Sequence, residues 1–202
     1  MWLALVGGLL AVMPLPAQQA ELAKGNFLIA SRTLRDPNFI HTVILLLEYG
    51  SEGAMGIIIN RPTRMELSTM LPEIESLAQR PDTVWLGGPV SRWQMLVLTR
   101  AEQEVEGSRN VLEDIYFSAS RVVLESLVDE EAEFRVYAGF AGWSPGQLEQ
   151  EMTRGGWLIL PGDAAMVFDE APDELWQELV QRADVKWVRR ELSADTGEGR
   201  AR

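Results

Sequence analysis

Residues 142–146, Gly-Trp-Ser-Pro-Gly, form the most recognisable catalytic pattern in this chain. They fit the G-x-S-x-G elbow, in which a serine on a turn between a strand and a helix attacks an acyl group. The flanking residues predict that context, because 134–140 are strand-like and 147–152 are helix-like. The pattern therefore raises the hypothesis of a hydrolase that uses Ser144, with His41 as its base.

The residue after Ser144 argues against this use of the serine. The oxyanion hole of an elbow includes the backbone N–H of that residue, and here it is Pro145, which has none. A structural role fits better: Ser144 caps the helix, Pro145 takes the first helical position, and Gln147 completes a capping box. In that case Ser144→Ala lowers the stability by about 1 kcal/mol. In a hydrolase it abolishes turnover and leaves the melting temperature unchanged.

The other residue types leave little room for metal or cofactor chemistry. The chain has no cysteine, which excludes disulfides, thiol catalysis and thiolate metal sites, and one histidine is too few for a usual zinc site. The densest acidic run, 129–133, lacks the ligand spacing of a calcium loop. Glu149 and Glu151 share a predicted helix but face different ways, so they do not form an acid and base pair. We expect no metal ion and no cofactor.

The balance of charge disfavours nucleic acid as a partner. Thirty acidic and eighteen basic side chains give a net charge of −12, so a duplex meets net repulsion. A basic patch at Lys186, Arg189 and Arg190 leaves local binding open, although a solvated helix or strand end explains it more simply. The expected partner is an unknown protein or small ligand.

The first residues have the character of a leader. Residues 2–13 are an unbroken apolar run, and no charged side chain occurs before Glu21. The run is too short to span a bilayer and suits the apolar part of a secretory signal, with cleavage after Ala17. Residues 1–17 therefore predict a signal peptide and export to the periplasm. The absence of basic residues there leaves two alternatives: translation from Met13, which makes the protein cytoplasmic, or an uncleaved leader that contacts a membrane.

Apolar patterning predicts a sheet with a central hairpin. Two continuously apolar strands, within 42–49 and 55–60, are joined by a glycine-containing turn, and their lack of alternation predicts that both faces are covered. A tight turn at 87–90 is predicted between two later strands. The other predicted strands are 26–31, 83–86, 94–99, 134–140 and 157–160.

Helical spacing predicts fewer helices than strands. One begins at Leu67 and is broken early by Pro72; a second, capped by Ser118 or Ser120, buries its apolar side chains. Those side chains are Val122, Val123, Leu124 and Leu127. Helices are also predicted at 147–152, ended by Gly155-Gly156, and at 172–182, and residues 193–202 predict a disordered tail. The fold class is therefore α+β around a largely antiparallel or mixed sheet.

Five short segments occur in an order that is specific as a series, although each is weak alone. They are GNFLIA at 25–30, DPNF at 36–39, GAMG at 53–56 leading into NRP at 60–62, GGPV at 87–90, and 139–151 followed by Trp157. Together they resemble the YqgE/AlgH family, a group of bacterial proteins without an established biochemical activity. The resemblance covers about residues 25–190, which we take as a single domain.

The resemblance implies an α+β fold whose bifurcated sheet is curled into a pseudo-barrel with flanking helices. It implies no catalytic residues, and the family name comes from a proposed regulator of alginate synthesis. The chain departs from the family pattern at Tyr49, where a histidine commonly follows the glutamate matched by Glu48. It also carries the apolar leader, and an exported protein cannot act directly on transcription.

Polar residues at the ends of predicted strands supply the expected ligand site. We expect Asp36, Asn60, Arg61 and the turn Gly87-Gly88-Pro89-Val90 to border a cleft, because loops at strand ends place polar groups without disturbing the core. Structural roles compete with this one. They are turn capping by Asp36 and Asn60, an ion pair for Arg61, and turns or close backbone approach at the glycines.

The expected function is a non-enzymatic binding or regulatory module. Trp143, Trp157 and Trp176 are interpreted as packing residues rather than a ligand cage. The alternative function is the hydrolase that uses Ser144.

Overall fold

The described part of the chain forms ten strands with helices around them. The structure, a computed structural model, describes residues 21–169 and 171–195. The strands are β1 (Asn26–Ala30), β2 (Val43–Gly50), β3 (Gly53–Ile58), β4 (Pro62–Glu66), β5 (Thr83–Leu86), β6 (Val90–Arg100), β7 (Arg109–Leu112), β8 (Ile115–Ser118), β9 (Phe134–Trp143) and β10 (Trp157–Pro161). The helices are α1 (Leu67–Met70), α2 (Arg121–Asp129), α3 (Gln147–Thr153), α4 (Ala164–Phe168), α5 (Pro172–Asp195) and the 3-10 helix η1 (Glu75–Gln79).

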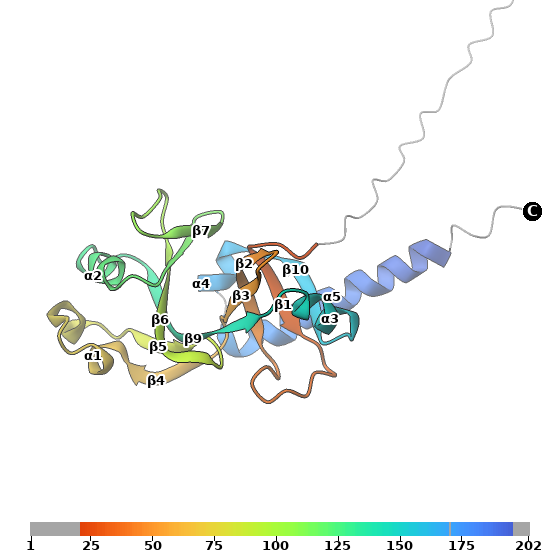
Figure 1. Cartoon of the computed structure of the whole chain (residues 1–202), viewed down its shortest axis with the longest axis horizontal. Helices are drawn as coiled ribbons and strands as arrows, with labels where there is room; N and C mark the ends of the chain where they lie inside the picture. The colour runs from red at the N-terminus through yellow and green to blue at the C-terminus, as the bar shows by residue number, and fades with distance from the viewer. Residues whose placement is uncertain (1–20, 170, 196–202) are drawn as a thin grey trace, which may run out of the picture.

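Strand β9 joins the two parts of the sheet (Figure 1). The neighbour order is β10-β1-β2-β3-β9-β6-β8-β7, with β5 and then β4 branching from β9. The first half of β9 lies between β5 and β6, whereas residues 141–143 pair with β3. Each of these pairs is antiparallel except β5 with β9. The predicted class is confirmed: an α+β fold whose largely antiparallel sheet bifurcates and curls into a half-barrel with flanking helices.

The hairpin of β2 and β3 lies at the centre of the sheet, as predicted. Residues 43–47 and 57–58 are fully buried. Leu45 and its alternate neighbours belong to one hydrophobic cluster, while Ile44 and Leu46 belong to another, so both faces of the strand are covered. Burial of one such side chain stabilises a fold by about 1.5–3 kcal/mol. This hairpin therefore anchors the domain.

The segment 87–90 differs from the tight turn predicted between neighbouring strands. β5 and β6 do not pair with each other, because β9 lies between them. Residues 87–89 instead cross from one side of β9 to the other. The local sequence contains turn residues but carries no sign of a strand that arrives much later in the chain.

Three strands and one helix are absent from the sequence prediction. β4 and β7 are mostly exposed and therefore lack the apolar alternation that marks a half-buried strand. β7 pairs with β8, which was also missed. α4 is buried on nearly all sides, so it shows no amphipathic period; it begins at Asp163, whose carboxylate accepts the Ala165 N–H at 3.0 Å.

Pro72 divides the first predicted helical region, as expected, into the short helix α1 and the 3-10 helix η1. In α2 the predicted burial of Val122 is wrong, since this side chain is 73% exposed. Ser120 holds the N-cap position of α2, but its side chain makes no capping bond. The predictions for Val123, Leu124 and Leu127 are confirmed, because all three are buried.

Helix α5 is longer than predicted and reaches Asp195. It therefore includes the first three residues of the predicted tail, 193–202, and the rest of that tail lies outside the described residues. The predicted leader, 1–17, also lies outside them. No helix that the structure describes has both the length and the apolar composition needed to cross a bilayer.

Candidate functional site

Ser144 opens a turn and does not cap α3, so the predicted cap is wrong. Its carbonyl accepts the Gln147 N–H at 3.0 Å, and Gly146 between them has φ 75° and ψ −6°. Proline followed by glycine at the two central positions is the signature of a type II turn. Residues 144–147 therefore form this turn, and the helix begins at Gln147. The N-cap residue is Gly146. Half of the predicted box is present, because the Gln147 side chain accepts the Ser144 N–H at 3.1 Å.

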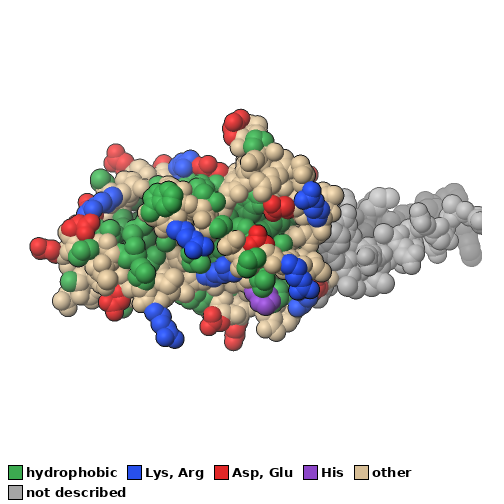
Figure 2. All heavy atoms as spheres, turned by 60° about the horizontal axis from the view of Figure 1, so that its bottom comes forward, with side chains coloured by type: hydrophobic (Ala, Val, Ile, Leu, Met, Phe, Trp, Pro, Cys, Tyr) green, Lys and Arg blue, Asp and Glu red, His purple; other side chains and the backbone are tan. Residues whose placement is uncertain are grey.

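The geometry around Ser144 supplies no base. Within the described residues no hydrogen bond reaches its hydroxyl, and an activated nucleophile requires one from its base. His41, the exposed purple side chain in Figure 2, packs its ring on Trp176 with the centroids 4.1 Å apart. Ser144 and His41 therefore do not form the hydrogen-bonded pair that the hydrolase hypothesis requires.

Ser144→Ala is expected to change the free energy of unfolding by less than about 0.5 kcal/mol, because it removes no capping bond. The control is Gly146→Ala. It places a side chain at φ 75° where no other atom lies within 4 Å, so it costs about 1 kcal/mol through backbone strain alone. Urea unfolding of both variants gives the comparison. If Ser144→Ala instead lowers the free energy of unfolding by about 1 kcal/mol or more, Ser144 caps the helix after all.

The far end of α3 closes as predicted. Gly155 has φ 74°, its N–H donates to Met152 O at 2.9 Å, and the Gly156 N–H donates to Glu151 O at 3.0 Å. This is a Schellman motif, which uses a glycine in the left-handed region to end a helix. The turn leads the chain directly into β10.

A cleft lies between this helix and the loop 33–39. Its volume is about 400 Å³, and the ends of β9 and β10 complete it. Three aromatic side chains line it: Phe39, Trp143 and Trp157. The two indoles meet edge to face with their centroids 6.0 Å apart, and the Phe39 ring lies 5.5 Å from Trp157 and 6.4 Å from Trp143. The tryptophans are 6% and 3% exposed, so their predicted packing role is confirmed, and their edges also line the cleft.

The Glu151 carboxylate fixes both tryptophans. Its Oε2 accepts the Trp143 Nε1–H at 3.0 Å and the Trp157 Nε1–H at 2.8 Å, and its Oε1 accepts Gln147 Nε2–H at 3.0 Å. Gln147 and Glu151 stand one turn apart on α3, at the spacing that places side chains side by side. This role of Glu151 was not predicted from the sequence. The sequence does contain a signal for it: Gln147 and Glu151 form an i, i+4 pair between Trp143 and Trp157.

Charged side chains from two segments line the rest of the cleft. Arg35 and Asp36 belong to the loop, and Arg154 is the C-cap residue of α3. Asp36 Oδ1 accepts the Asn38 N–H at 2.8 Å, which confirms its predicted role as a turn cap. Asp36 is the one residue of the predicted ligand site that lines this cleft.

Asn60 and Arg61 hold the loop that follows Asp36. Asn60 donates to His41 O at 3.0 Å and accepts from the Val43 N–H at 2.9 Å. Arg61 donates to Asn38 O at 2.7 Å and Ile40 O at 3.0 Å, so the predicted ion pair is replaced by bonds to carbonyls. Burial lowers the pKa of Arg61. The hydrogen bonds of Asn60 go to the backbone of His41 and Val43, so Asn60 does not cap its own turn as the alternative role had it.

Gly87 and Gly88 let the chain cross β9 in contact with its backbone. The Gly87 N–H donates to Ala138 O at 2.9 Å, and its carbonyl accepts the Ile58 N–H at 2.8 Å. A Cβ at Gly87 would lie 2.3 Å from Gly139 O, and one at Gly88 would lie 2.1 Å from Phe140 C. Close backbone approach, one of the roles weighed from the sequence, is confirmed here. A ligand role for Asn60, Arg61, Gly87, Gly88 and Pro89 stays a prediction.

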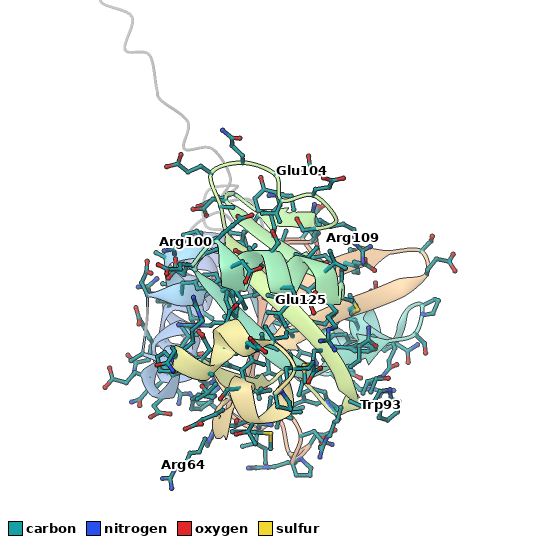
Figure 3. All side chains as sticks on the ribbon, turned by 90° about the vertical axis from the view of Figure 1, so that its left-hand side faces the viewer. Arg64, Trp93, Arg100, Glu104, Arg109 and Glu125 are labelled. Atoms are coloured by element: carbon teal, nitrogen blue, oxygen red, sulfur yellow. The ribbon has the colours of Figure 1, made fainter. Side chains whose placement is uncertain are left out.

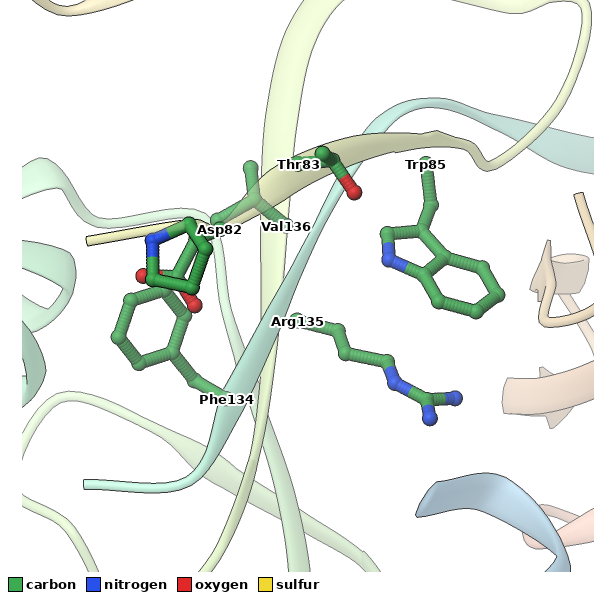
Figure 4. A pocket seen from close by; sticks show the side chains of 7 residues that line it. Asp82, Thr83, Trp85, Phe134, Arg135 and Val136 are labelled. Carbon is green, nitrogen blue, oxygen red and sulfur yellow. The ribbon is translucent and has the colours of Figure 1, made fainter. Parts of the chain in front are cut away.

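A second, smaller cavity of about 210 Å³ lies beside Arg135 (Figure 4). The Arg135 guanidinium lies 4.3 Å from the centroid of Trp85, and its N–H groups donate to the carbonyls of Val167 and Phe168 at the end of α4. On the same strand, burial raises the pKa of Tyr137 to about 12. Because the Arg135 guanidinium already binds two backbone carbonyls and packs on Trp85, we assign Arg135 a structural role and do not take this cavity as the ligand site. Within the described residues no group of three or more His, Asp or Glu side chains is arranged to hold a metal ion.

Comparison with known proteins places these features in a family. Residues 27–188 match the AlgH-like family. The chain belongs to the AlgH-like family. A UPF0301 protein of Thioalkalivibrio sulfidiphilus is 40% identical over 165 residues, which are 79% of this chain and 89% of that protein. A UPF0301 protein of Streptomyces coelicolor is 36% identical over 172 residues, covering 81% and 89%.

Two solved structures are similar to this AlgH-like chain. The solution structure of the AlgH protein from Pseudomonas aeruginosa has a TM-score of 0.65 and 32% identity, covering 82% of this chain and 92% of that one. A crystal structure of a Corynebacterium diphtheriae protein has a TM-score of 0.69, with 22% identity over 82% and 89% of the two chains. At that identity the second likeness shows the fold alone. Every residue that lines the aromatic cleft lies within the family match.

Tyr49, where this AlgH-like chain departs from the pattern described above, ties the central hairpin to α3. Its hydroxyl donates to Glu149 Oε1 at 2.6 Å. This hydrogen bond lowers the pKa of Glu149, and together with burial it raises the pKa of Tyr49. The stabilisation is lost as pH falls through the lowered Glu149 value, below the ordinary 4.5, and as pH rises through the raised Tyr49 value, above the ordinary 10.0.

Tyr49→Phe is therefore expected to cost about 1 kcal/mol near neutral pH, because the bond to a charged group is partly exposed. The difference from the wild type should shrink below about pH 4 and above about pH 10. Denaturant unfolding across this range measures it. The control is Tyr116→Phe, since the Tyr116 hydroxyl has no hydrogen-bond partner in the part of the chain that the structure describes. A cost that stays constant with pH would contradict the assigned bond.

Proposed function

We propose that this AlgH-like chain is a non-enzymatic binding module for a small ligand, and that its site is the aromatic cleft. The observation that carries the proposal is the cleft of about 400 Å³ in which one carboxylate, Glu151, holds two indoles in place. Small-molecule sites have volumes of about 300–1,000 Å³ and combine apolar walls with a few fixed polar groups. The cleft has both properties.

The arrangement is suited to binding because its parts are preorganised. The positions of Trp143 and Trp157 are fixed by hydrogen bonds, so little side-chain entropy is lost when a ligand arrives. Glu151 already accepts three N–H groups, which favours an orienting role over proton transfer. Ser144 precedes the same helix, and no described residue donates to or accepts from its hydroxyl as a base would. These features support recognition without turnover.

The test is a thermal-shift screen of a defined library of small metabolites against the full chain. A compound that raises the melting temperature of the wild type should lose most of this effect in Phe39→Ala, because Phe39 forms one wall of the cleft. The matched control is Trp93→Ala, which removes an aromatic side chain that is 86% exposed (Figure 3) and does not line the cleft.

Mass spectrometry of the recovered compound separates binding from catalysis. The proposal predicts that the compound is recovered unchanged. A compound that stabilises Phe39→Ala as much as the wild type would place the site elsewhere, and a converted compound would show that the chain is an enzyme.

A further inference from the structure

Two arginines that line the aromatic cleft are left without partners. The guanidinium groups of Arg35 and Arg154 make no ion pair and no hydrogen bond with any described residue. By contrast, the acidic groups of the cleft are engaged: Glu151 accepts three N–H groups, and Asp36 accepts the Asn38 N–H. The cleft therefore offers cations whose hydrogen-bond donors are unused.

Partnered arginines are the rule in this acidic chain. Six of the described arginines pair with carboxylates: Arg32, Arg80, Arg100, Arg109, Arg121 and Arg182. Arg61 and Arg135 donate to backbone carbonyls. The remaining arginines whose side chains the structure describes are Arg35 and Arg154 in the cleft and Arg64 and Arg92 outside it. Two unpaired guanidinium groups in one cavity thus stand out against a net charge of −12.

The fold brings together the two segments that carry the cleft arginines. The Ser31 N–H donates to Gly156 O at 3.0 Å, and Leu34 Cδ1 lies 3.6 Å from the Cβ position at Gly156. The segments that carry Arg35 and Arg154 are therefore adjacent. Guanidinium groups bind carboxylate and phosphate oxygens through paired N–H donors, and the aromatic side chains line the same cleft.

We infer that the ligand of this cleft is a small oxyanion with a flat apolar body. The oxyanion, a carboxylate or a phosphate, binds Arg35 and Arg154, and the flat body packs on Phe39 and the edges of the two tryptophans. This inference rests on the proposed function, because it assigns the chemistry of the same site. Rim charges of this kind set which ligand is selected.

Four aromatic probes of similar size test the charge preference: benzoate, phenyl phosphate, neutral benzyl alcohol and cationic benzylammonium. Each is titrated into the full ¹⁵N-labelled chain, and the indole N–H signals of Trp143 and Trp157 report binding. We expect at least one anion to bind about tenfold more tightly than benzyl alcohol, and benzylammonium to bind more weakly than benzyl alcohol. The stronger anion identifies the oxyanion as carboxylate or phosphate.

Variants of the two arginines complete the test. Arg35→Gln and Arg154→Gln should each weaken the preferred anion about fivefold while leaving benzyl alcohol unchanged. Arg64→Gln changes an exposed arginine (Figure 3) that does not line the cleft, and it should have no effect. Equal binding of all four probes, or preference for benzylammonium, overturns the inference but keeps the cleft as a site. No indole shift with any probe overturns the proposed function as well.

Discussion

Gly87→Ala is expected to destabilise the chain by more than about 3 kcal/mol or to prevent folding, because overpacking against backbone cannot be relieved by a rotamer change. The new Cβ would lie 2.3 Å from Gly139 O and 3.0 Å from Tyr137 Cβ. The segment cannot move away, since the N–H and carbonyl of Gly87 bind Ala138 and Ile58. Urea unfolding, or soluble yield where the variant does not fold, measures the effect.

The matched control is Gly50→Ala in the central hairpin. A Cβ at Gly50 meets no atom within 4 Å, and its φ lies outside the left-handed region. This change should therefore be neutral within about 0.5 kcal/mol. Equal urea midpoints for Gly87→Ala and Gly50→Ala would contradict the close approach of Gly87 to the backbone of β9.

Arg135→Ala is expected to cost about 2–4 kcal/mol, because it leaves two helix carbonyls without donors and removes a cation from the face of Trp85. The carbonyls belong to Val167 and Phe168, at the end of α4 (Figure 1). The melting temperature should fall by about 5–15 °C for a domain of this size.

Arg135→Lys separates the charge of this residue from its geometry. A lysine keeps the positive charge but carries its N–H donors on a single nitrogen, so it does not reproduce the two-nitrogen fork of arginine and should recover less than half of the loss. Full recovery by lysine would show that charge alone matters at this position. An unchanged melting temperature in Arg135→Ala would contradict the described contact with α4.

The central part of the fold could be predicted because its signals are local. The continuous apolar runs of β2 and β3 indicate strands covered on both faces, and Gly155 marks the end of α3. The crossing at Gly87 could not be predicted in the same way. Its shape depends on contact with β9, which is distant in sequence. From the sequence alone, Gly87 and Gly88 therefore indicated only a turn.

The candidate site was predicted only in part, for a related reason. Asp36 was expected to border a cleft together with Asn60 and Arg61; it lines a different cleft, whereas Asn60 and Arg61 bind the backbone of neighbouring loops. Their polar character was correctly noticed, but their partners lie some twenty positions away and follow from the fold. Trp143 and Glu151 show the converse: neither was predicted to border a site, and their hydrogen bond between β9 and α3 forms part of the cleft wall.

Ligand binding at the aromatic cleft is tested most directly by the indole N–H signals of the ¹⁵N-labelled chain, which has seven tryptophans. During titration with the four aromatic probes, the signals of Trp143 and Trp157 should shift together and saturate with one dissociation constant, because Glu151 holds both indoles. The signal of Trp93, which is 86% exposed outside the cleft, should not move. Shifts that leave Trp143 and Trp157 unchanged, or that affect Trp93 equally, would contradict a ligand site in the cleft.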